Sequence, residues 1–255
     1  MAHSKIRQQP NTIKQGRRLS ARILDVSSLD ADTIRAMFDL YMCYYEATTR
    51  ELFSADLLAK DQVILLYDDT SILRGFSTLK LIDSQWNGQP YRVIFSGDTI
   101  VHHLFWGEQA LAFTWIRRAG EIKAEQPNTP LYYLLIVKGH RTYRYLQAFT
   151  LTYYPHWKNV TPKFMQGLMD QLGERMFSQY YRHDKGVVHF SVSRGQLRPE
   201  WAEPSNEVRR RPEVQFFLKK NPGYRLGDEL LCLTELCSDN LRPLSRRLFE
   251  AGMNG

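Results

Sequence analysis

Residues 62–82 read QVILLYDDTSILRGFSTLKLI. The apolar run at 63–67 has the length of a strand, and it ends in the segment Asp-Asp-Thr at 68–70, whose residue types favour a tight turn. The residues that follow, 72–82, are again rich in apolar side chains. The stretch therefore predicts two antiparallel strands joined by a short turn.

Further elements follow on both sides of this hairpin. The pair Asn-Gly at 87–88 marks a second turn, so that 91–101 becomes the third strand of an antiparallel meander. Upstream, Asp30 or Asp32 can cap an amphipathic helix whose apolar residues recur every three or four positions. These residues are Ile34, Met37, Phe38, Tyr41, Tyr44 and Tyr45. A shorter helix is expected at 54–60, just before the first strand.

The pattern changes after the meander. Residues 107–125 have helical periodicity, 131–137 is a near-continuous apolar run typical of a strand covered on both faces, and 139–149 reads as another helix. Beyond residue 155 the expected elements are a helix at 161–181, a strand at 186–193, a helix at 212–220, a strand at 229–236 and a helix at 240–251.

This order predicts an α+β (mixed α/β) fold with a central mixed sheet flanked by helices. We expect three segments: a basic, mobile tail at 1–22, the main folded core at 23–155, and an α/β extension at 156–255 that packs on the core.

Composition excludes several classes of protein. The chain has 255 residues, of which 43% are hydrophobic, enough for a large core. Its three cysteines form no C-x-x-C pair, which argues against a disulfide framework or a thiolate zinc site. No apolar run reaches the length of a membrane span or of a secretory signal, so we expect a soluble, cytoplasmic protein without a membrane span.

The net charge of +7 is concentrated near the N-terminus. Six cations precede the first acid, Asp25, and the rest of the chain has 28 cations against 27 acids. A nearly balanced body without a zinc finger or RNA-binding signature does not indicate a specific nucleic-acid partner. The basic tail either has no specific role or gives salt-sensitive attraction to an acidic surface.

Two residues near the end of the third strand are candidates for acid–base chemistry. Asp98 lies in an otherwise apolar strand, where a carboxylate must find partners or have a raised pKa. It is either a general base or a structural acid that accepts backbone hydrogen bonds around Gly97. His103 is a second possible base, and adjacent strand residues point to opposite faces, so His102 and His103 are not expected to share one metal or substrate. No metal site is expected.

Cations follow the buried strand at the start of the next helix. Lys138 and Arg141 could meet a phosphate or carboxylate there, because helix N-termini favour anions. The sequence lacks G-x-x-x-x-G-K-[ST], G-x-G-x-x-G and G-x-S-x-G, so P-loop hydrolysis, dinucleotide redox chemistry and the common serine-hydrolase arrangement have no support.

The meander at 63–101, the helix from Gly107, the buried strand and the helix after it together resemble the GNAT superfamily of N-acetyltransferases. The resemblance covers roughly residues 25–155, with 62–82 similar to that family's second and third strands. It implies a GNAT-like fold, no permanently bound cofactor, and acyl-CoA as the donor substrate. A branch similar to the acyl-homoserine-lactone synthases or to long-chain N-acyltransferases is a further possibility.

The resemblance also implies site residues. In that family the turn before the helix at 107–125 binds the coenzyme A pyrophosphate, which points to Trp106, Gly107 and Glu108, with Lys138 and Arg141 as further donor-binding residues. Leu104 and Gln109 stand where the family has a cation or Gln and a Gly or Ala. Two donors are therefore considered: an acyl-CoA held differently, or an acyl group carried on an acyl carrier protein.

For chemistry, the resemblance implies that Asp98 or His103 deprotonates an amine and that Tyr145 protonates the departing thiolate. Aromatic packing is the alternative interpretation of Tyr145. The resulting hypothesis is an acyltransferase that moves an acyl group from an acyl thioester to an amine acceptor, with a homodimer possible. The alternative is a non-catalytic binding or regulatory protein that keeps a GNAT-like fold.

Overall fold

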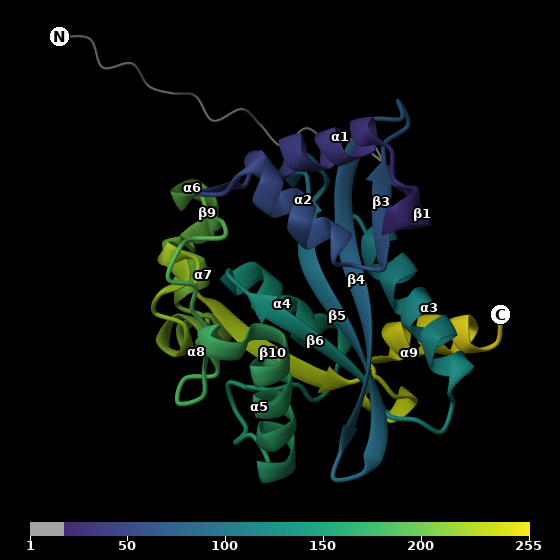
Figure 1. Ribbon diagram of the computed structural model, residues 1–255, viewed down its shortest axis with the longest axis vertical. Helices are drawn as coiled ribbons and strands as arrows, with labels where there is room; N and C mark the ends of the chain where they lie inside the picture. Colours follow the sequence, from purple (N-terminus) through teal and green to yellow (C-terminus); the bar gives the residue numbers. More distant parts are fainter. Residues whose placement is uncertain (1–17) are drawn as a thin grey trace.

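A mixed sheet with helices on both faces organises residues 18–255, the part of the chain that the computed structural model describes (Figure 1). The strands are β1 (Ser20–Asp25), β2 (Tyr45–Glu46), β3 (Gln62–Tyr67), β4 (Leu73–Trp86), β5 (Gln89–Val101), β6 (Leu131–Val137), β7 (Tyr181–Arg182), β8 (Val187–Val188), β9 (Gln196–Leu197) and β10 (Glu229–Glu235). The α-helices are α1 (Ala31–Met42), α2 (Arg50–Leu58), α3 (Ala110–Glu125), α4 (His140–Phe149), α5 (Lys163–Phe177), α6 (Pro199–Ala202), α7 (Asn206–Arg209), α8 (Pro212–Lys220) and α9 (Pro243–Met253). Short 3-10 helices lie at η1 (Val26–Ser28), η2 (His103–Phe105), η3 (Ser178–Tyr180), η4 (Tyr224–Leu226) and η5 (Ser238–Asn240).

The large sheet has the strand order β1-β3-β4-β5-β6-β10-β8-β7. Strands β3, β4 and β5 form the expected antiparallel meander, and β5 and β6 are parallel because α3 crosses over between them. The first turn is held by the Asp68 carboxylate, which accepts hydrogen bonds from the backbone of Thr70 and Ile72. The second turn places Asn87 and Gly88 at positive φ, as a two-residue hairpin requires. The predicted mixed α/β fold class and its central mixed sheet are confirmed.

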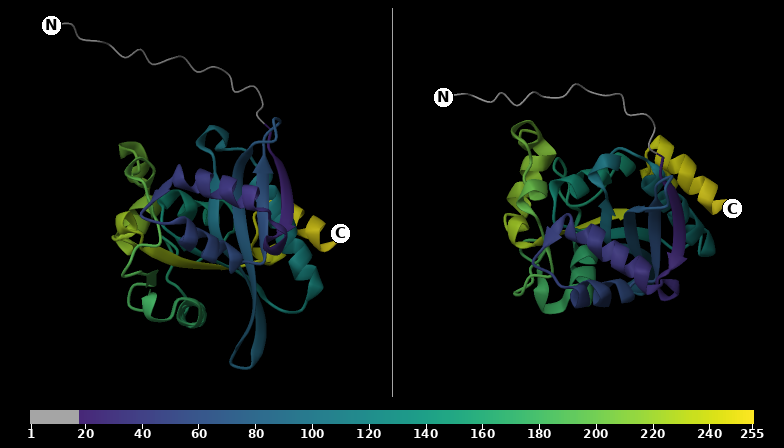
Figure 2. Two further views of the ribbon diagram at one scale, coloured as in Figure 1. Left: turned by 45° about the horizontal axis from the view of Figure 1, so that its top comes forward. Right: turned by 90° about the horizontal axis from the view of Figure 1, so that it is seen from above.

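Successive side chains of a strand point to opposite faces of the sheet and pack against different helices. Val63 and Leu65 pack with α1 and α2, whereas Ile64 and Leu66 pack with α3 and α9. Helix α5 covers the first of these faces over β5, β6 and β10, and α4 and α8 cover the second. Helices α1, α2 and α5 thus lie on one face of the sheet, and α3 and α9 lie on the other (Figure 2).

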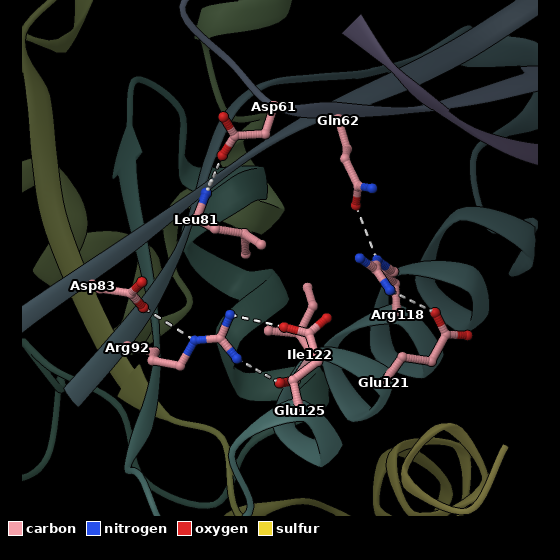
Figure 3. A network of polar contacts seen from close by, with 9 residues as sticks. All are labelled: Asp61, Gln62, Leu81, Asp83, Arg92, Arg118, Glu121, Ile122 and Glu125. Atoms are coloured by element: carbon pink, nitrogen blue, oxygen red, sulfur yellow. Dashed lines mark hydrogen bonds and ion pairs between the residues drawn. The ribbon is translucent and has the colours of Figure 1, made fainter. Parts of the chain in front are cut away.

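A polar network ties α3 to the meander (Figure 3). Arg92 on β5 is only 8% exposed, and its guanidinium donates to Asp83, to the carbonyl of Ile122 and to Glu125. Arg118 makes a second group of contacts, with Gln62 on β3 and with Glu121. All donors of a buried guanidinium must be paired, so this network restricts how α3 can lie on the sheet.

Helices α3 and α9 pack closely through two glycines. A Cβ on Gly120 would stand 2.0 Å from the carbonyl oxygen of Phe249, and a Cβ on Gly252 would stand 2.0 Å from that of Arg117. The helices can approach this closely because neither residue has a side chain. The last helix is therefore part of the core that holds α3.

The structure differs from the sequence-based elements in several places. Residues 20–22, placed in the basic tail, belong to β1, which pairs with β3; residues 1–17 of that tail lie outside the described residues. The expected strand at 186–193 is only Val187–Val188, which pairs with β7 and β10. The helix expected to reach residue 181 ends at Phe177, since Ser178 adopts a positive φ. Most importantly, β10 from the 156–255 segment joins the main sheet beside β6.

Candidate active site

The candidate site lies where β5 and β6 separate. Their parallel pairing runs from Arg92–Leu131 to Ser96–Leu135 and then stops, although both strands continue. At the same level β5 has a bulge, because Ser77 pairs with Thr99 and Leu79 with Ser96, leaving two β5 residues opposite one of β4. The backbone groups of β5 that face β6 beyond Ser96 therefore have no strand partner.

The bulge explains the glycine at position 97. A Cβ there would stand 2.7 Å from Lys60 Cε and 2.7 Å from Thr78 Oγ1. Gly97 thus allows the Lys60 side chain to cross the strand, where its ammonium lies 2.6 Å from the Asp56 carboxylate. The next residue, Asp98, is directed into the space between α2 and α5.

A cavity of about 620 Å³ occupies that space. Its walls combine aromatic rings with both signs of charge, and its lining includes Tyr41, Tyr45, Asp56, Lys60, Lys80, Phe95, Asp98, Thr99, Lys138, Thr142, Arg175, Phe177, Phe190, Arg194 and Glu229. Its dimensions suit a small organic molecule.

Asp98 has the properties of a poised carboxylate. Burial and the nearby Asp56 raise its pKa to about 6, although Lys138 and Lys60 oppose the rise. Within residues 18–255 its carboxylate has no hydrogen-bond donor, so the alternative of a structural acid bonded to the backbone around Gly97 is not what the geometry shows. A carboxyl of this pKa is mostly ionised at neutral pH and can accept a proton.

A second acid, Glu229, lies in the same cavity. It is the first residue of β10, it is only 6% exposed, and its carboxylate lies 3.5 Å from Lys138 Nζ. Burial raises the pKa of Glu229 to about 7, with Asp98 adding to the rise and Lys138 opposing it. Glu229 belongs to no motif in the sequence. Its only signal is an acid at the start of an apolar run, and that signal gains meaning only once β10 is known to lie beside β6.

A second cavity of about 290 Å³ opens beyond the end of β5. It is lined by Tyr44, Tyr45, Thr99, Ile100, Val101, Trp106, Gly139, Arg141, Thr142, Arg144, Tyr145, Leu197 and Trp201. Three residues, Tyr45, Thr99 and Thr142, line both cavities. The two spaces therefore meet at the point where β5 and β6 part.

The five sequence-predicted donor-binding residues are divided by the structure. Trp106 and Arg141 line the second cavity, where the guanidinium lies 5.0 Å from the centre of the indole ring. Lys138 lines the first cavity instead. Gly107, at φ +96°, and Glu108 line neither.

Glu108 has a different structural role at the start of α3. Its carboxylate accepts a 2.6 Å hydrogen bond from the backbone amide of Ala110, the first residue of the helix. This side chain places a negative charge at the helix end that the resemblance assigns to a pyrophosphate.

The predicted catalytic residues are also separated. Asp98 lines the first cavity and Tyr145 the second. Tyr145 is 49% exposed, stacks on Phe149, and has a pKa raised by partial burial. Its neighbour Tyr143 is fully buried and donates to the carbonyl of Pro155, so Tyr143 belongs to the core.

His103 lies in neither cavity lining. Its backbone amide donates to the Tyr44 hydroxyl at 2.6 Å, and its Nδ1 lies 3.1 Å from the same oxygen. The expectation that His102 and His103 point to opposite faces is wrong, because β5 ends at Val101 and the two rings stack 4.5 Å apart in η2. Among residues 18–255 no three His, Cys, Asp or Glu side chains are grouped so that they could hold a metal ion.

The chain is similar to known proteins in structure but not in sequence. No protein-family model and no curated protein matches the sequence. A probable N-acyltransferase of unknown function from Enterococcus faecalis is similar in structure, with a TM-score of 0.39, 16% identity, and coverage of 52% of this chain and 33% of that chain. This chain thus spans about a third of that protein.

Two further solved structures have similar scores. A GNAT family N-acetyltransferase from Escherichia coli in complex with CoA has a TM-score of 0.37 and 15% identity, covering 55% of this chain and 72% of that chain. An acyl-CoA N-acyltransferase from Pseudomonas aeruginosa has a TM-score of 0.33 and 16% identity, covering 54% and 92%. No helix among the described residues is long and apolar enough to cross a membrane. The chain itself has a mixed α/β fold.

Proposed function

We propose that the protein is an acyltransferase that moves an acyl group from an acyl thioester to an amine. The observation that carries the proposal is the position of Asp98. This carboxylate, with a pKa of about 6, lies in a cavity that meets a second cavity where two parallel strands part.

The first cavity would hold the acceptor amine. Asp98 accepts a proton from the ammonium or from the amine as it attacks, directly or through one water. Its pKa suits this task, because the group is ionised at neutral pH and still basic enough to take the proton. Lys138 lowers the pKa of this carboxyl, and Asp98 in turn raises the pKa of Glu229.

The thioester would enter through the second cavity. The amine nitrogen attacks the thioester carbonyl carbon, a C–N bond forms, and the C–S bond breaks. Backbone amides of β5 without a strand partner beyond Ser96 supply donors for the oxyanion. Tyr145 gives its phenolic proton to the departing thiolate and regains one from solvent, because half of the side chain is exposed.

The charged and aromatic side chains around the second cavity support a choice of donor. Arg141 near the N-terminus of α4 offers positive charge, whereas Arg144 pairs with Glu213 and Glu108 places negative charge at the N-terminus of α3. This distribution favours a donor whose phosphates lie near α4 rather than α3, or an acyl group delivered by a carrier protein. The aromatic lining suits an acyl chain longer than acetyl, as in the acyl-homoserine-lactone-synthase-like or long-chain branches.

One observation favours a second function, that of a non-catalytic binding or regulatory protein. The Glu108 carboxylate already bonds the first amide of α3 and so competes with a diphosphate for that amide. A binding protein would keep the cavities and take up the thioester or its product without turnover.

Release of free thiol from acyl-CoAs and acyl carrier proteins, measured with a mixture of primary amines present, tests the proposal. Amine-dependent thiol release is expected, and Asp98→Asn should lower it by about 10²-fold or more at neutral pH. Asp69→Asn is the matched control, because Asp69 is an exposed acid in the β3–β4 turn. Binding of a thioester without amine-dependent release would favour the binding protein instead.

A further inference from the structure

The outer part of the acceptor cavity has cations without acidic partners. Lys80 on β4, Arg175 on α5 and Arg194 before β9 all line it. Within the described residues none of the three has a carboxylate at ion-pair distance. The cavity thus has an uncompensated positive charge that the acyl-transfer chemistry does not use.

The three cations contact neutral groups instead of carboxylates. Lys80 Nζ donates to the carbonyl of Ala59 at 2.6 Å, and Arg175 Nη1 donates to Ser84 Oγ at 2.7 Å. Arg194 lies over the rings of Phe190 and Tyr180, at 4.6 and 5.4 Å from their centres. Each of these contacts leaves guanidinium or ammonium donors available to a ligand.

The inner cations differ from the outer ones. The Lys60 side chain is 3% exposed and pairs with Asp56, and the Lys138 side chain is 11% exposed and pairs with Glu229. Inside the cavity, therefore, positive charges are matched by carboxylates, whereas Arg175 and Arg194 are exposed at its entrance. The cavity has a charge-balanced inner end with Asp98 and a cationic outer end.

The sheet register gives the distance between the two ends. Lys80 pairs with Phe95, and Asp98 follows Phe95 by three residues on β5. At about 3.3 Å per residue, Lys80 lies about 10 Å from Asp98 along the strand. Arg175 lies farther out, because Ser84, whose hydroxyl it bonds, pairs with Tyr91, seven residues from Asp98. The cavity walls also include the apolar side chains Ile82, Phe95, Phe177 and Phe190.

We infer that the acceptor is an amine that also bears an anionic group, a carboxylate or a phosphate, about 10 Å from the reacting nitrogen. The amine lies against Asp98, the apolar body lies against the aromatic walls, and the anion is bound by Lys80 and Arg194, with Arg175 farther out. Because ammonium and guanidinium groups both bind carboxylate and phosphate oxygens, either anion suits Lys80 and Arg194. The inference rests on the proposed acyl transfer and specifies its acceptor.

The test compares amines that differ only in the distal group. Aminohexanoate, aminohexyl phosphate and hexylamine are measured as acceptors at a fixed acyl-donor concentration, and their binding is measured by calorimetry without any donor. The better of the two anionic amines should exceed hexylamine by about tenfold in kcat/KM and in affinity. Comparison of the carboxylate with the phosphate shows which anion is preferred.

Variants locate the effect. Arg194→Gln should raise KM for the preferred anionic amine by about fivefold to tenfold and change that for hexylamine by less than about twofold. Arg194 is exposed and its variant should fold, which the unfolding temperature checks. Lys163→Gln, an exposed cation at the other end of α5 from Arg175, is the control and should change neither.

The outcomes separate the two proposals. If amines are acylated but hexylamine binds and reacts as well as both anionic probes, the anion site is wrong and the acyltransferase stands. If no amine is acylated but the anionic probes bind through Arg194, the acyltransferase is wrong and the anion site stands. If Arg194→Gln leaves binding of both anionic amines unchanged, the inference is overturned.

Discussion

Replacing Glu229 by Gln should reduce the pH dependence of the protein's stability. The Glu229 carboxyl is buried and has a pKa of about 7, against 4.5 for an unperturbed Glu. The folded state therefore holds a proton on this group at pH values where the unfolded chain has lost it. Because the folded state binds more protons, the free energy of unfolding falls as the pH rises from about 4.5 to 7.

The size of the effect follows from the same pKa values. The difference between 4.5 and about 7 corresponds to about 3 kcal/mol, at about 1.4 kcal/mol per pKa unit. Asp98 titrates in an overlapping range with the same sign, from 3.8 to about 6, so the wild-type protein loses stability through both groups. Glu229→Gln removes one of these contributions, and about 2 kcal/mol of the loss between about pH 5 and pH 8 should disappear.

Urea unfolding followed by tryptophan fluorescence at the two pH values measures the difference. At about pH 5 Glu229 is protonated in the folded wild type and forms no ion pair with Lys138, and at about pH 8 the attraction of Lys138 is already included in the pKa of about 7. Glu200→Gln, at an exposed position on α6, is the control and should follow the wild-type curve. If Glu229→Gln loses as much stability as wild type between the two pH values, the carboxyl does not carry a proton in the folded protein and the reasoning is refuted.

Three further predictions concern chemistry, donor binding and packing. The acidic limb of the pH profile of kcat/KM should have a pKa of about 6, that of Asp98. Lys138→Met should raise this pKa by about one unit, because the ammonium stabilises the ionised carboxylate; an unchanged pKa would mean that Lys138 does not act on Asp98. Glu108→Gln should tighten CoA binding, measured by calorimetry, by about threefold, because it removes negative charge beside the Ala110 amide; unchanged affinity would place the phosphates elsewhere. Gly120→Ala should lower stability by about 2 kcal/mol and Tm by about 6 °C, since its Cβ would collide with α9; a Tm at or above that of wild type would contradict the packing of these helices.

Local patterns predicted the elements around the site well. The turn at Asp68, the Asn87–Gly88 hairpin and the Asp30 cap of α1 all rest on side chains that bond their own neighbourhood or on φ values that few residues adopt. Such features depend on a few adjacent residues. For that reason the meander and the helices on either side of it could be found from the sequence.

Elements held by distant partners could not be found in this way. Within residues 18–255, strand β1 lies at the edge of the sheet and pairs with β3 alone, and its short polar-apolar sequence carries no signal of its own. β10 was expected as a strand, but nothing in its sequence says that it pairs with β6. Glu229 therefore could not be connected with Asp98 before the sheet order was known.

The same difference between local and distant contacts applies to the site residues. Asp98 could be noticed because an acid interrupts an apolar strand. The place of His103 depends on where β5 ends, a boundary that the Tyr44 hydroxyl helps to set through its bond with the His103 amide. The cationic outer end of the cavity combines three elements, far apart in sequence, that only the tertiary structure brings together.

Mass spectrometry of the products of one reaction tests the central claim most directly. The wild-type protein is incubated with acyl thioesters from acetyl to palmitoyl, as CoA and carrier-protein forms, and with primary amines. The account predicts an N-acyl amide whose yield depends on acyl length and falls to background with Asp98→Asn. Absence of amide from every donor, or the same yield from Asp98→Asn, would contradict it.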